Sequence, residues 1–560
     1  MLKQISKPVS LYLLFIAASL FLFGFITAHI PLWSSDEGRY GEIAREMLES
    51  RDFIVPSFNY VDYLEKPVLS PLFTALMYGL FGVSAFATRI PSILCALGGI
   101  FLTFFFIRRL FNARAAGYSA LALLTSVGYV LVGRFAVIDM QMIFLLSGAV
   151  FCLMTGFFEK NRAAYLAAYF FMGLGFLTKG LIAPVLPAMI FGLFLLWSRR
   201  WDALKEISLG RGLLILALVT LPWAVTISLR EPEFFRVFII EHHFQRFATG
   251  GFGRHRPFWF FTYIIPIITF PWILFVPFAI VRGLRGGDPV RQNKIRFLIC
   301  WMAVIFIFFS LPKSKLPYYI VPICVPMAVL AGTFLADWIS GHLSPVESRV
   351  NGWLWKIIAL LCVSAVVGLN IAASLVKEPE ILILQGIIRI AAVVLGAGGI
   401  LAFLFYRRGK AHAAVLALAG MIYAVLLIIT LGMLELSPLQ SAEPFAVRLK
   451  PLLQADDVVA VYGSPDRFSD LPFYLQRRVM VAGTDRGTLA RESAEEGHRE
   501  ESLEWFLKPE EFARFFNGRT RRVFCLLEAE RLPELTQQDL GPYKTIMEDS
   551  GKMLLSNELP

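Results

Sequence analysis

The sequence predicts an all-α polytopic membrane domain followed by a small soluble α/β domain. The chain of 560 residues is 57% hydrophobic and only 17% charged, whereas soluble domains carry about 25% charged residues. Long apolar runs recur over residues 1–435, and about 20 helical residues are enough to cross the hydrocarbon of a bilayer. Residues 436–560 lack such runs and are expected to form the soluble domain.

About thirteen membrane spans are expected from these apolar runs. The first follows Lys3 and Lys7 and is expected to remain uncleaved, because it is too long for a signal-peptide core and no small-x-small cleavage site follows it. The predicted spans cover residues 9–30, 86–107, 115–133, 140–158, 163–178, 180–198, 211–229, 258–281, 297–311, 317–338, 353–376, 384–406 and 412–434.

Basic residues predict the orientation of these spans. They gather in alternate short loops, at Arg108-Arg109, Lys160 and Arg162, Arg199-Arg200, residues 282–296 and Arg407-Arg408-Lys410. By the positive-inside rule, these loops and the N-terminus lie in the cytoplasm. The loops 31–85 and 230–257 and the soluble domain then lie on the outer side of the membrane. This topology explains the formal net charge of +11, so we expect no nucleic-acid partner.

The soluble domain is predicted to alternate strands with helices. Residues 458–463, 478–482 and 522–527 are apolar and rich in β-branched side chains, which predicts strands, and residues 471–476 are a predicted helix. Five of the six cysteines lie in predicted spans, and the sequence contains no Cys-x-x-Cys pair or disulfide framework.

A predicted amphipathic helix follows the first span. Residues 37–50 place apolar side chains at helical spacing on one side, so we expect this helix to lie at the membrane surface. Ser34 and Glu37 have the spacing of a capping box at its start. The charged residues expected to point away from the apolar side are Arg39, Glu42, Arg45 and Glu46.

Asp36, at the start of this helix, has two interpretations. It caps the helix, or it is a functional carboxylate in the most polar stretch of the membrane domain. The two do not exclude each other, because the positive end of a helix dipole keeps a carboxylate ionised. An ionised carboxylate is what a catalytic base, or a group that stabilises a cation, must be.

Asp139 is a second candidate acid. It follows Arg134 at the outer end of the third span or the start of the fourth. It is either an interfacial anchor paired with Arg134 or a functional group, since carboxylates within membranes are costly.

Seven basic residues map to the outer ends of spans, against the positive-inside rule. Each one taken singly fits a side chain that snorkels to the interface, but seven together favour a lipid phosphate, which guanidinium and ammonium groups bind. The seven are Lys66, Lys179, Arg246, Arg254, Arg256, Lys313 and Lys315. A divalent metal site is a further possibility, with candidate ligands Glu65, His242, His243 and His255.

These motifs resemble the integral-membrane glycosyltransferases that use polyprenyl-phosphate sugars, above all the aminoarabinose transferases of lipid A modification (the ArnT family), which are related to protein O-mannosyltransferases. The resemblance runs in order from about residue 10 to 340. It is found in Asp36-Glu37-x-Arg39-Tyr40-x-Glu42-Ile43-x-Arg45-Glu46-Met47-Leu48, Tyr63-x-Glu65-Lys66-Pro67, Asp139, Thr178-Lys179-Gly180, Arg230-Glu231-Pro232-x-Phe234, Glu241-His242-x-x-Gln245-Arg246-Phe247, Pro257-Phe258-Trp259 and Lys313-x-Lys315-Leu316-Pro317-x-Tyr319.

The resemblance implies a C-type glycosyltransferase membrane fold, with juxtamembrane helices in the loop 31–85 and catalysis at the periplasmic face. It assigns Asp36 as the principal catalytic carboxylate and Asp139 as a second acid. The donor phosphate would be bound by Lys66, Arg39, Tyr40, Tyr63, Tyr319 and either Arg254 or Arg256. Further cavity candidates are Glu37, Lys179, Arg246, Lys313 and Lys315. Glu65 and a histidine of residues 230–257 would hold a divalent ion such as zinc, magnesium or manganese.

Two stretches depart from the family pattern. Ser70-Pro71-Leu72 stands where the family tends to carry an aromatic pair, and Arg254-His255-Arg256 is shifted by one residue relative to the family's His-Arg pair. The first departure affects a contact to sugar or acceptor, and the second leaves the choice between Arg254 and Arg256 open.

The expected reaction moves a sugar, 4-amino-4-deoxy-L-arabinose by this resemblance, from undecaprenyl phosphate to a lipid A phosphate or another lipid acceptor. A phosphate acceptor is already ionised, whereas the hydroxyl acceptor of a protein O-mannosyltransferase would need Asp36 as a general base. Both acceptors stay open at this point. A transporter or lipid flippase is disfavoured, because transporters place charges near the midplane and show internal repeats, neither of which is visible here.

Overall fold

The computed structural model describes residues 17–25, 27–238, 255–375, 378–484, 489 and 504–558, most of them in helices. The chain divides into two compact units. The helical unit comprises Met1–Thr27, Glu65–Ser70 and Pro91–Gly432, and the sheet unit comprises Ala28–Leu64, Pro71–Ile90 and Met433–Pro560. Apart from Glu65–Ser70, the first loop therefore belongs to the same unit as the tail of the chain.

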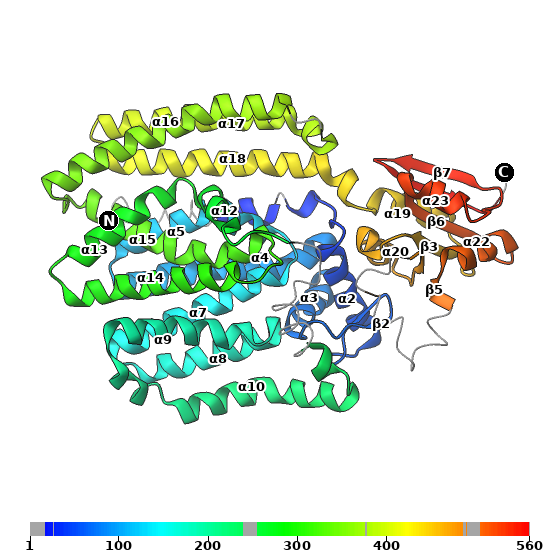
Figure 1. Cartoon of the computed structure of the whole chain (residues 1–560), viewed down its shortest axis with the longest axis horizontal. Helices are drawn as coiled ribbons and strands as arrows, with labels where there is room; N and C mark the ends of the chain where they lie inside the picture. Colours follow the sequence, from blue (N-terminus) through cyan, green and yellow to red (C-terminus); the bar gives the residue numbers. More distant parts are fainter. Residues whose placement is uncertain are drawn as a thin grey trace, which may run out of the picture. The chain divides into compact units, whose positions relative to one another are not determined.

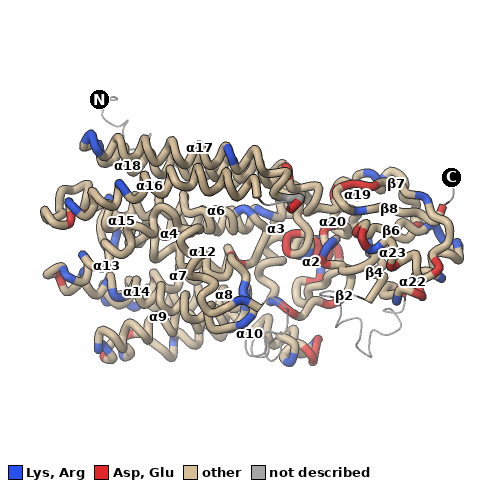
Figure 2. The backbone as a smooth tube through the Cα atoms, turned by 45° about the horizontal axis from the view of Figure 1, so that its top comes forward, with Lys and Arg blue, Asp and Glu red and all other residues tan. Residues whose placement is uncertain are grey.

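Eight helices among the described residues are long and apolar enough to cross a membrane, or up to ten spans if each of two bent pairs counts as one. The eight are α4 (Ala85–Leu110), α7 (Ile138–Glu159), α10 (Leu209–Arg230), α14 (Pro289–Ser310), α15 (Cys324–Ile339) with the preceding 3₁₀ turn η6 (Pro317–Ile323), α16 (Pro345–Leu375), α17 (Pro379–Arg407) and α18 (Ala411–Gln440). Figure 2 shows the charged residues of the helical unit mainly at helix ends. The prediction of a multi-pass membrane protein is confirmed, and the count of about thirteen spans stays a prediction.

Two predicted spans are bent. Residues 115–133 form α5 (Ala113–Leu124) and α6 (Val127–Arg134), which meet at 62°. Residues 258–281 form α12 (Phe260–Thr269) and, after a turn of 101°, η5 (Trp272–Phe275) and α13 (Val276–Arg285). The second bend contains Pro271, which has no N–H to continue the helix. A run of apolar residues predicts the length of a span but not a bend within it.

Small residues allow close packing within the helical unit. α16 and α17 run side by side, and α7 packs against α8 (Arg162–Lys179) (Figure 1). A Cβ atom on Gly156 of α7 would lie 2.8 Å from the ring of Tyr165 on α8, and one on Gly399 of α17 would lie 2.4 Å from Cβ of Cys362 on α16. Glycine at these positions lets the helices approach each other, as is typical of membrane helix pairs.

The tail forms a six-stranded mixed sheet within the sheet unit. The strand order is β5 (Phe506–Leu507), β4 (Met480–Ala482), β3 (Val458–Tyr462), β6 (Val523–Glu528), β8 (Lys552–Ser556), β7 (Lys544–Asp549). β5, β4, β3 and β6 are parallel, and β8 and β7 add antiparallel strands at one side. The predicted strands correspond to β3, β4 and β6 and the predicted helix to α20 (Leu471–Leu475), whereas β5, β7 and β8 were not predicted.

Both faces of this sheet are covered. On β3, Val459 and Val461 join one apolar cluster with α19 (Glu443–Leu449) and α20. Val458, Ala460 and Tyr462 point to the other face, where they pack with α22 (Pro509–Gly518). Burial on both sides explains why this strand is apolar throughout and does not alternate with polar residues.

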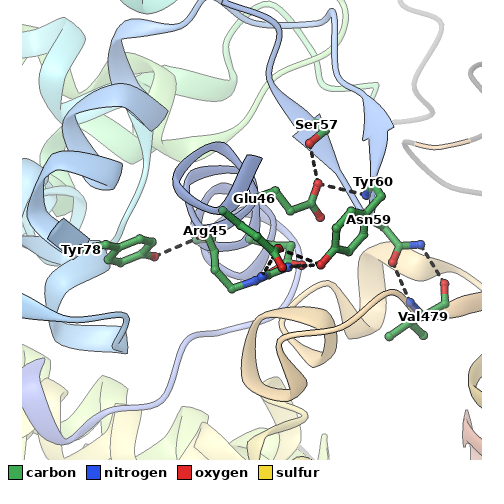
Figure 3. A network of polar contacts seen from close by, with 10 residues as sticks. Arg45, Glu46, Ser57, Asn59, Tyr60, Tyr78 and Val479 are labelled. Atoms are coloured by element: carbon green, nitrogen blue, oxygen red, sulfur yellow. Dashed lines mark hydrogen bonds and ion pairs between the residues drawn. The ribbon is translucent and has the colours of Figure 1, made fainter. Parts of the chain in front are cut away.

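The first loop shares a core with the tail. It contains helix α2 (Asp36–Ser50) and the hairpin of β1 (Ser57–Phe58) and β2 (Val61–Asp62). Ile43 and Phe58 from the loop pack with Val481 and Phe506 from the sheet. The side chain of Asn59 makes two hydrogen bonds of 2.8 Å with the backbone of Val479, 420 residues later (Figure 3). Loop and sheet therefore form one body.

An amphipathic helix at the membrane surface would leave the charged residues of α2 exposed, and the structure differs from that expectation. Arg39, Glu42, Arg45 and Glu46 are all buried. Burial is possible because the charged side chains pair with one another. Nε and Nη2 of Arg45 donate to the carboxylate of Glu42 at 2.7 Å, and Nη1 donates to Glu49 at 2.7 Å. The carboxylate of Glu46 accepts from the hydroxyl of Ser57 and the backbone of Tyr60 (Figure 3).

Candidate functional site

Asp36 is the first residue of α2, and its carboxylate is paired with Arg39 one turn later. Arg39 Nη2 donates to Asp36 Oδ1 at 2.5 Å. The side chain of Asp36 is 33% exposed, whereas that of Arg39 is only 10% exposed. The guanidinium carbon of Arg39 lies 5.5 Å from the ring centre of Tyr40. The acid is thus accessible to a ligand, while the base that holds it is buried.

A second carboxylate contacts the same arginine. Arg39 Nη1 lies 3.5 Å from Oδ1 of Asp466, which follows strand β3 in the tail. Burial opposes the charge on Arg39, but attraction by Tyr63, Asp36 and Asp466 outweighs it and raises the pKa of the guanidinium. Arg39 therefore stays positively charged between two acids.

The capping box predicted from Ser34 and Glu37 was wrong. The helix is preceded by Ser35, at φ 77°, whose side chain does not cap it. The hydroxyl of Ser34 donates instead to Asp470 at 2.6 Å. Glu37 is buried and accepts from Arg89 and from the backbone of Trp33. Asp470 and Arg89 come from elsewhere in the sheet unit, and their bonds to Ser34 and Glu37 replace the capping box that the spacing predicts.

In the helical unit, Asp139 is paired with Lys179. Asp139 lies in the first turn of α7 and Lys179 is the last residue of α8, and their side chains form an ion pair of 2.5 Å. The ammonium of Lys179 also lies 5.3 Å from the ring centre of Tyr319. The structure thus brings together three of the predicted site residues, within hydrogen-bonding or cation–π distance.

The pairing of Asp139 with Arg134 was wrong. Arg134 Nε donates to the backbone carbonyl of Leu22 at 3.0 Å, and Nη1 donates to the hydroxyl of Thr430 at 2.5 Å. The guanidinium is fully buried and is held by backbone and hydroxyl oxygens. Lys179 is the cation beside Asp139.

A third group lies beside the 3₁₀ turn η6. His255 forms a β-bridge with Ser314, and the backbone N–H of Arg256 donates to the carbonyl of Lys313 at 3.0 Å. Lys315 is buried, and its ammonium donates to the carbonyls of Pro312 and Arg256. Burial lowers the pKa of Lys315. Lys315 therefore fixes the two segments to each other, and Arg256 and Lys313 are exposed.

The remaining predicted residues fall into two sets. Lys66 is half-buried and donates to the carbonyl of Glu65 at 3.2 Å. The others lie outside the described residues, namely His242, His243, Arg246 and Arg254. Within the described ranges, no three His, Cys, Asp or Glu side chains gather closely enough to hold a metal ion. The metal site stays a prediction, because two of its candidate ligands, His242 and His243, lie outside the described residues.

Sequence reasoning missed several residues that contact this site. Arg89 did have a signal, because it is a charged residue inside the apolar run 86–107. Asp466, Ser469 and Asp470 had none, since Ser469 and Asp470 lie more than 430 residues from the serines that they bind. Only the fold brings them to the start of α2.

The chain is similar in sequence to one family model and to bacterial transferases. A family model described as dolichyl-phosphate-mannose-protein mannosyltransferase matches residues 65–225. An undecaprenyl phosphate-alpha-4-amino-4-deoxy-L-arabinose arabinosyl transferase of Aeromonas salmonicida is 31% identical over 405 residues, which cover 70% of this chain and 72% of that protein. A transferase of the same name from Pseudomonas fluorescens is 32% identical, and the match spans 62% of each chain, less than two thirds of the relative.

The fold of a solved relative extends this similarity. ArnT from Cupriavidus metallidurans, in a crystal structure with bound undecaprenyl phosphate, matches with a TM-score of 0.86 and 25% identity. The match covers 99% of both chains, including the tail.

Proposed function

Because the chain belongs to the family of undecaprenyl phosphate–aminoarabinose arabinosyl transferases, we propose that it moves 4-amino-4-deoxy-L-arabinose from undecaprenyl phosphate to a phosphate of lipid A. Family membership makes the chain a membrane glycosyltransferase, and it rules out the transporter or flippase that the sequence left as an alternative. The observation that supports the donor best is the likeness, over 99% of each chain, to an ArnT that binds undecaprenyl phosphate. We place the reaction at the periplasmic face of the inner membrane, as the charges of the loops predict.

The proposed reaction is a displacement at the anomeric carbon. An oxygen of the acceptor phosphate forms a bond to this carbon, and the bond to the donor phosphate oxygen breaks. The electron pair leaves with undecaprenyl phosphate. Positive charge develops on the sugar and negative charge on the leaving phosphate during this step. Groups that stabilise both charges should therefore accelerate it.

Asp36 is suited to the positive side of this reaction. Its carboxylate is held by a buried arginine and is one-third exposed, so it has a fixed position and an accessible surface. In this proposal Asp36 stabilises the cationic sugar or orients the acceptor. With a hydroxyl acceptor, it would also remove the proton.

Basic groups would stabilise the leaving phosphate. Arg256 and Lys313 are exposed and linked through their backbones, and Lys66 is half-buried, so these three cations can bind a phosphate. Tyr40, Tyr63 and Tyr319 were also predicted as phosphate ligands, and that role stays a proposal. Tyr63 is buried in the apolar cluster around Ile43 and Phe58, which favours a supporting role for it.

Protein O-mannosyl transfer is the second candidate. It is favoured by the match of residues 65–225 to the mannosyltransferase family model. The two candidates share a lipid-phosphate donor and differ in sugar and acceptor. They also differ in what they require of Asp36, because only a hydroxyl acceptor needs a base.

Mass spectrometry of lipid A tests the proposal. The host should make the arabinose donor but lack its own transferase, and it should express the wild-type chain, Asp36→Asn or, as a control, Asp456→Asn. Asp456 is an exposed acid in the same unit, so its replacement makes the same change of charge away from the site. We expect an aminoarabinose mass increment with the wild type and the control, and little or none with Asp36→Asn.

One result would refute this proposal, and a second would favour protein O-mannosyl transfer. No increment from a wild-type protein that is present in the membrane would refute aminoarabinose transfer to lipid A. Mannosylated periplasmic protein from the same cells, when a polyprenyl-phosphate mannose is supplied, would then favour the second candidate.

A further inference from the structure

The segment that follows strand β3 in the tail lies at a special position of the sheet. β4 and β6 flank β3 on opposite sides, so the strand order reverses at the carboxyl end of β3. Open α/β sheets bind their ligands at such a reversal, just beyond the strand ends. Here the switch segment, residues 464–470, contains the short helix η8 (Pro465–Phe468), and α2 packs against η8 and α20. In this protein, α2, the helix that begins with Asp36, packs at the strand end where such sheets usually bind a ligand.

Two side chains of the switch segment hold the backbone just before Asp36. Ser469 Oγ accepts from the N–H of Ser35 at 2.7 Å and donates to its carbonyl at 3.1 Å. Asp470 accepts from the hydroxyl of Ser34 at 2.6 Å. Ser35 has a φ of 77°, which residues other than glycine rarely adopt. These bonds fix the unusual conformation from which the helix starts.

Asp470 is itself firmly placed. It is fully buried, and its second oxygen accepts from the hydroxyl of Ser441 and the N–H of Ala442, both at 2.7 Å. A Cβ atom on Gly38 would lie only 2.4 Å from the backbone nitrogen of Asp470. The first turn of α2 and the switch segment are therefore in direct backbone contact, with no space for adjustment.

Asp466 contacts the arginine that holds Asp36. Arg39 uses Nη2 for Asp36 at 2.5 Å, and its other terminal nitrogen, Nη1, lies 3.5 Å from Asp466. The two acids thus share one guanidinium, each at a different nitrogen. A guanidinium that is free at one end can turn to bind a carboxylate through two parallel hydrogen bonds. Asp466 opposes that turn.

We propose that Asp466 is a positioning residue of the transferase. By attracting Nη1 of Arg39, it holds the guanidinium in the orientation in which Nη2 donates to Asp36, whose carboxylate is one-third exposed. The tail of the chain is then part of the catalytic apparatus. The inference rests on the proposed function only in assigning Asp36 to the reaction.

Kinetics of the purified full-length chain test this role. The assay uses undecaprenyl phosphate-linked aminoarabinose and lipid A in detergent. We expect Asp466→Asn to lower kcat on the order of 10-fold through misplacement of the acid, with KM for the donor nearly unchanged. Asp466→Glu should restore most of the rate, and the control Asp456→Asn should match the wild type.

Dependence on Arg39 separates positioning from a general loss of structure. In an Arg39→Met background, Asp466→Asn should cause no further loss of kcat. The inference is overturned if Asp466→Asn keeps the wild-type kcat. It is also overturned if Asp466→Asn lowers kcat by the same factor in the Arg39→Met background as in the wild type.

A second measurement does not depend on the reaction. Thermal unfolding of the wild type, both single variants and the double variant gives a double-mutant cycle for Asp466 and Arg39. Non-additive changes in Tm support the pairing even if the wild type makes no product, a result that would refute the proposed function alone. Additive changes would overturn the inference whatever the activity.

Discussion

The guanidinium of Arg89 lies 2.7 Å from the carboxylate of Glu37, 52 residues earlier, and both side chains are only 2% exposed. The same guanidinium donates to the carbonyls of Ile30 and Pro31 at 2.5 and 2.7 Å. This one arginine, near the start of α4, thus donates hydrogen bonds both to backbone carbonyls of the segment before α2 and to an acid in the first turn of α2. This arrangement fixes the start of α2 within the sheet unit.

Replacement of Arg89 should destabilise the sheet unit strongly. Arg89→Met leaves Glu37 as a buried carboxylate without its cation, which typically costs about 3–5 kcal/mol. The double variant Arg89→Met, Glu37→Leu removes both charges and should recover much of this loss. Thermal unfolding in detergent measures the difference. A double variant no more stable than Arg89→Met would contradict the explanation.

Gly38 should not tolerate a side chain. A methyl group there would lie 2.7 Å from Cα of Asp470, and backbone cannot move aside as a flexible side chain does. Overpacking of this kind costs about 1–3 kcal/mol, so Gly38→Ala should lower Tm and activity together. Gly79→Ala is the matched control, because a Cβ atom at Gly79, in the last turn of α3 (Leu69–Phe81), meets nothing within 4 Å. Equal losses from the two variants would argue against steric contact at Gly38.

Much of the fold could be predicted because it depends on apolar patterns. The spans and the strand β3 are continuous apolar segments, which a sequence displays directly. The half-exposed strand β7 has no such pattern. The apolar run 258–281 predicted the length of a span, but the bend at Pro271 within it was not predicted.

The candidate site was predictable only in part. Asp36 was selected from its place in the polar stretch after the first span, and Arg39 and Tyr40 were added by the resemblance to a known family. Their partners were not predictable, because Asp466 and Asp470 approach them only after the tail folds onto the first loop. The helix α2 also shows the limit of amphipathic patterns: Arg45 and Glu46 are buried because they have partners, and partners are invisible in one sequence.

The ion pair of Asp139 and Lys179 should act as a unit. Lys179→Met would leave a largely buried acid without its cation, and Asp139→Asn would leave the cation without its acid. We expect each single variant to lose at least about 10-fold in kcat/KM. Because each change already breaks the same pair, the double variant should be no worse than the poorer single variant. Losses that multiply would show that the two residues act separately.

Two acids on α2, Glu46 and Glu49, should affect stability in opposite directions as the pH changes. Burial and the nearby charge of Glu42 raise the pKa of Glu46. The pKa of Glu49 is lowered: partial burial alone would raise it, but hydrogen bonds from Arg45 and Tyr60 outweigh that effect. An unfolded chain has glutamate near pKa 4.3.

The sign follows from these shifts. A raised pKa means that the folded state holds its proton more tightly, so the wild type loses stability from Glu46 as pH rises from about 4.3 through the folded value. Glu46→Gln has no proton to lose, and its amide oxygen can still accept from Ser57 and Tyr60. Relative to the wild type, this variant should gain in Tm as pH rises above about 4.3.

Glu49→Gln is the matched control with the opposite sign. The lowered pKa contributes stability above about pH 4.3, and this contribution is lost as pH falls through the folded value. Glu49→Gln should therefore lower Tm at neutral pH and match the wild type in acid. The loss should be small, about 0.2–1 kcal/mol, because the Glu49 side chain is 53% exposed. Thermal unfolding of the three proteins between about pH 2 and 8 covers the windows of both acids and measures both slopes. Slopes of the same sign would contradict the buried network of Figure 3.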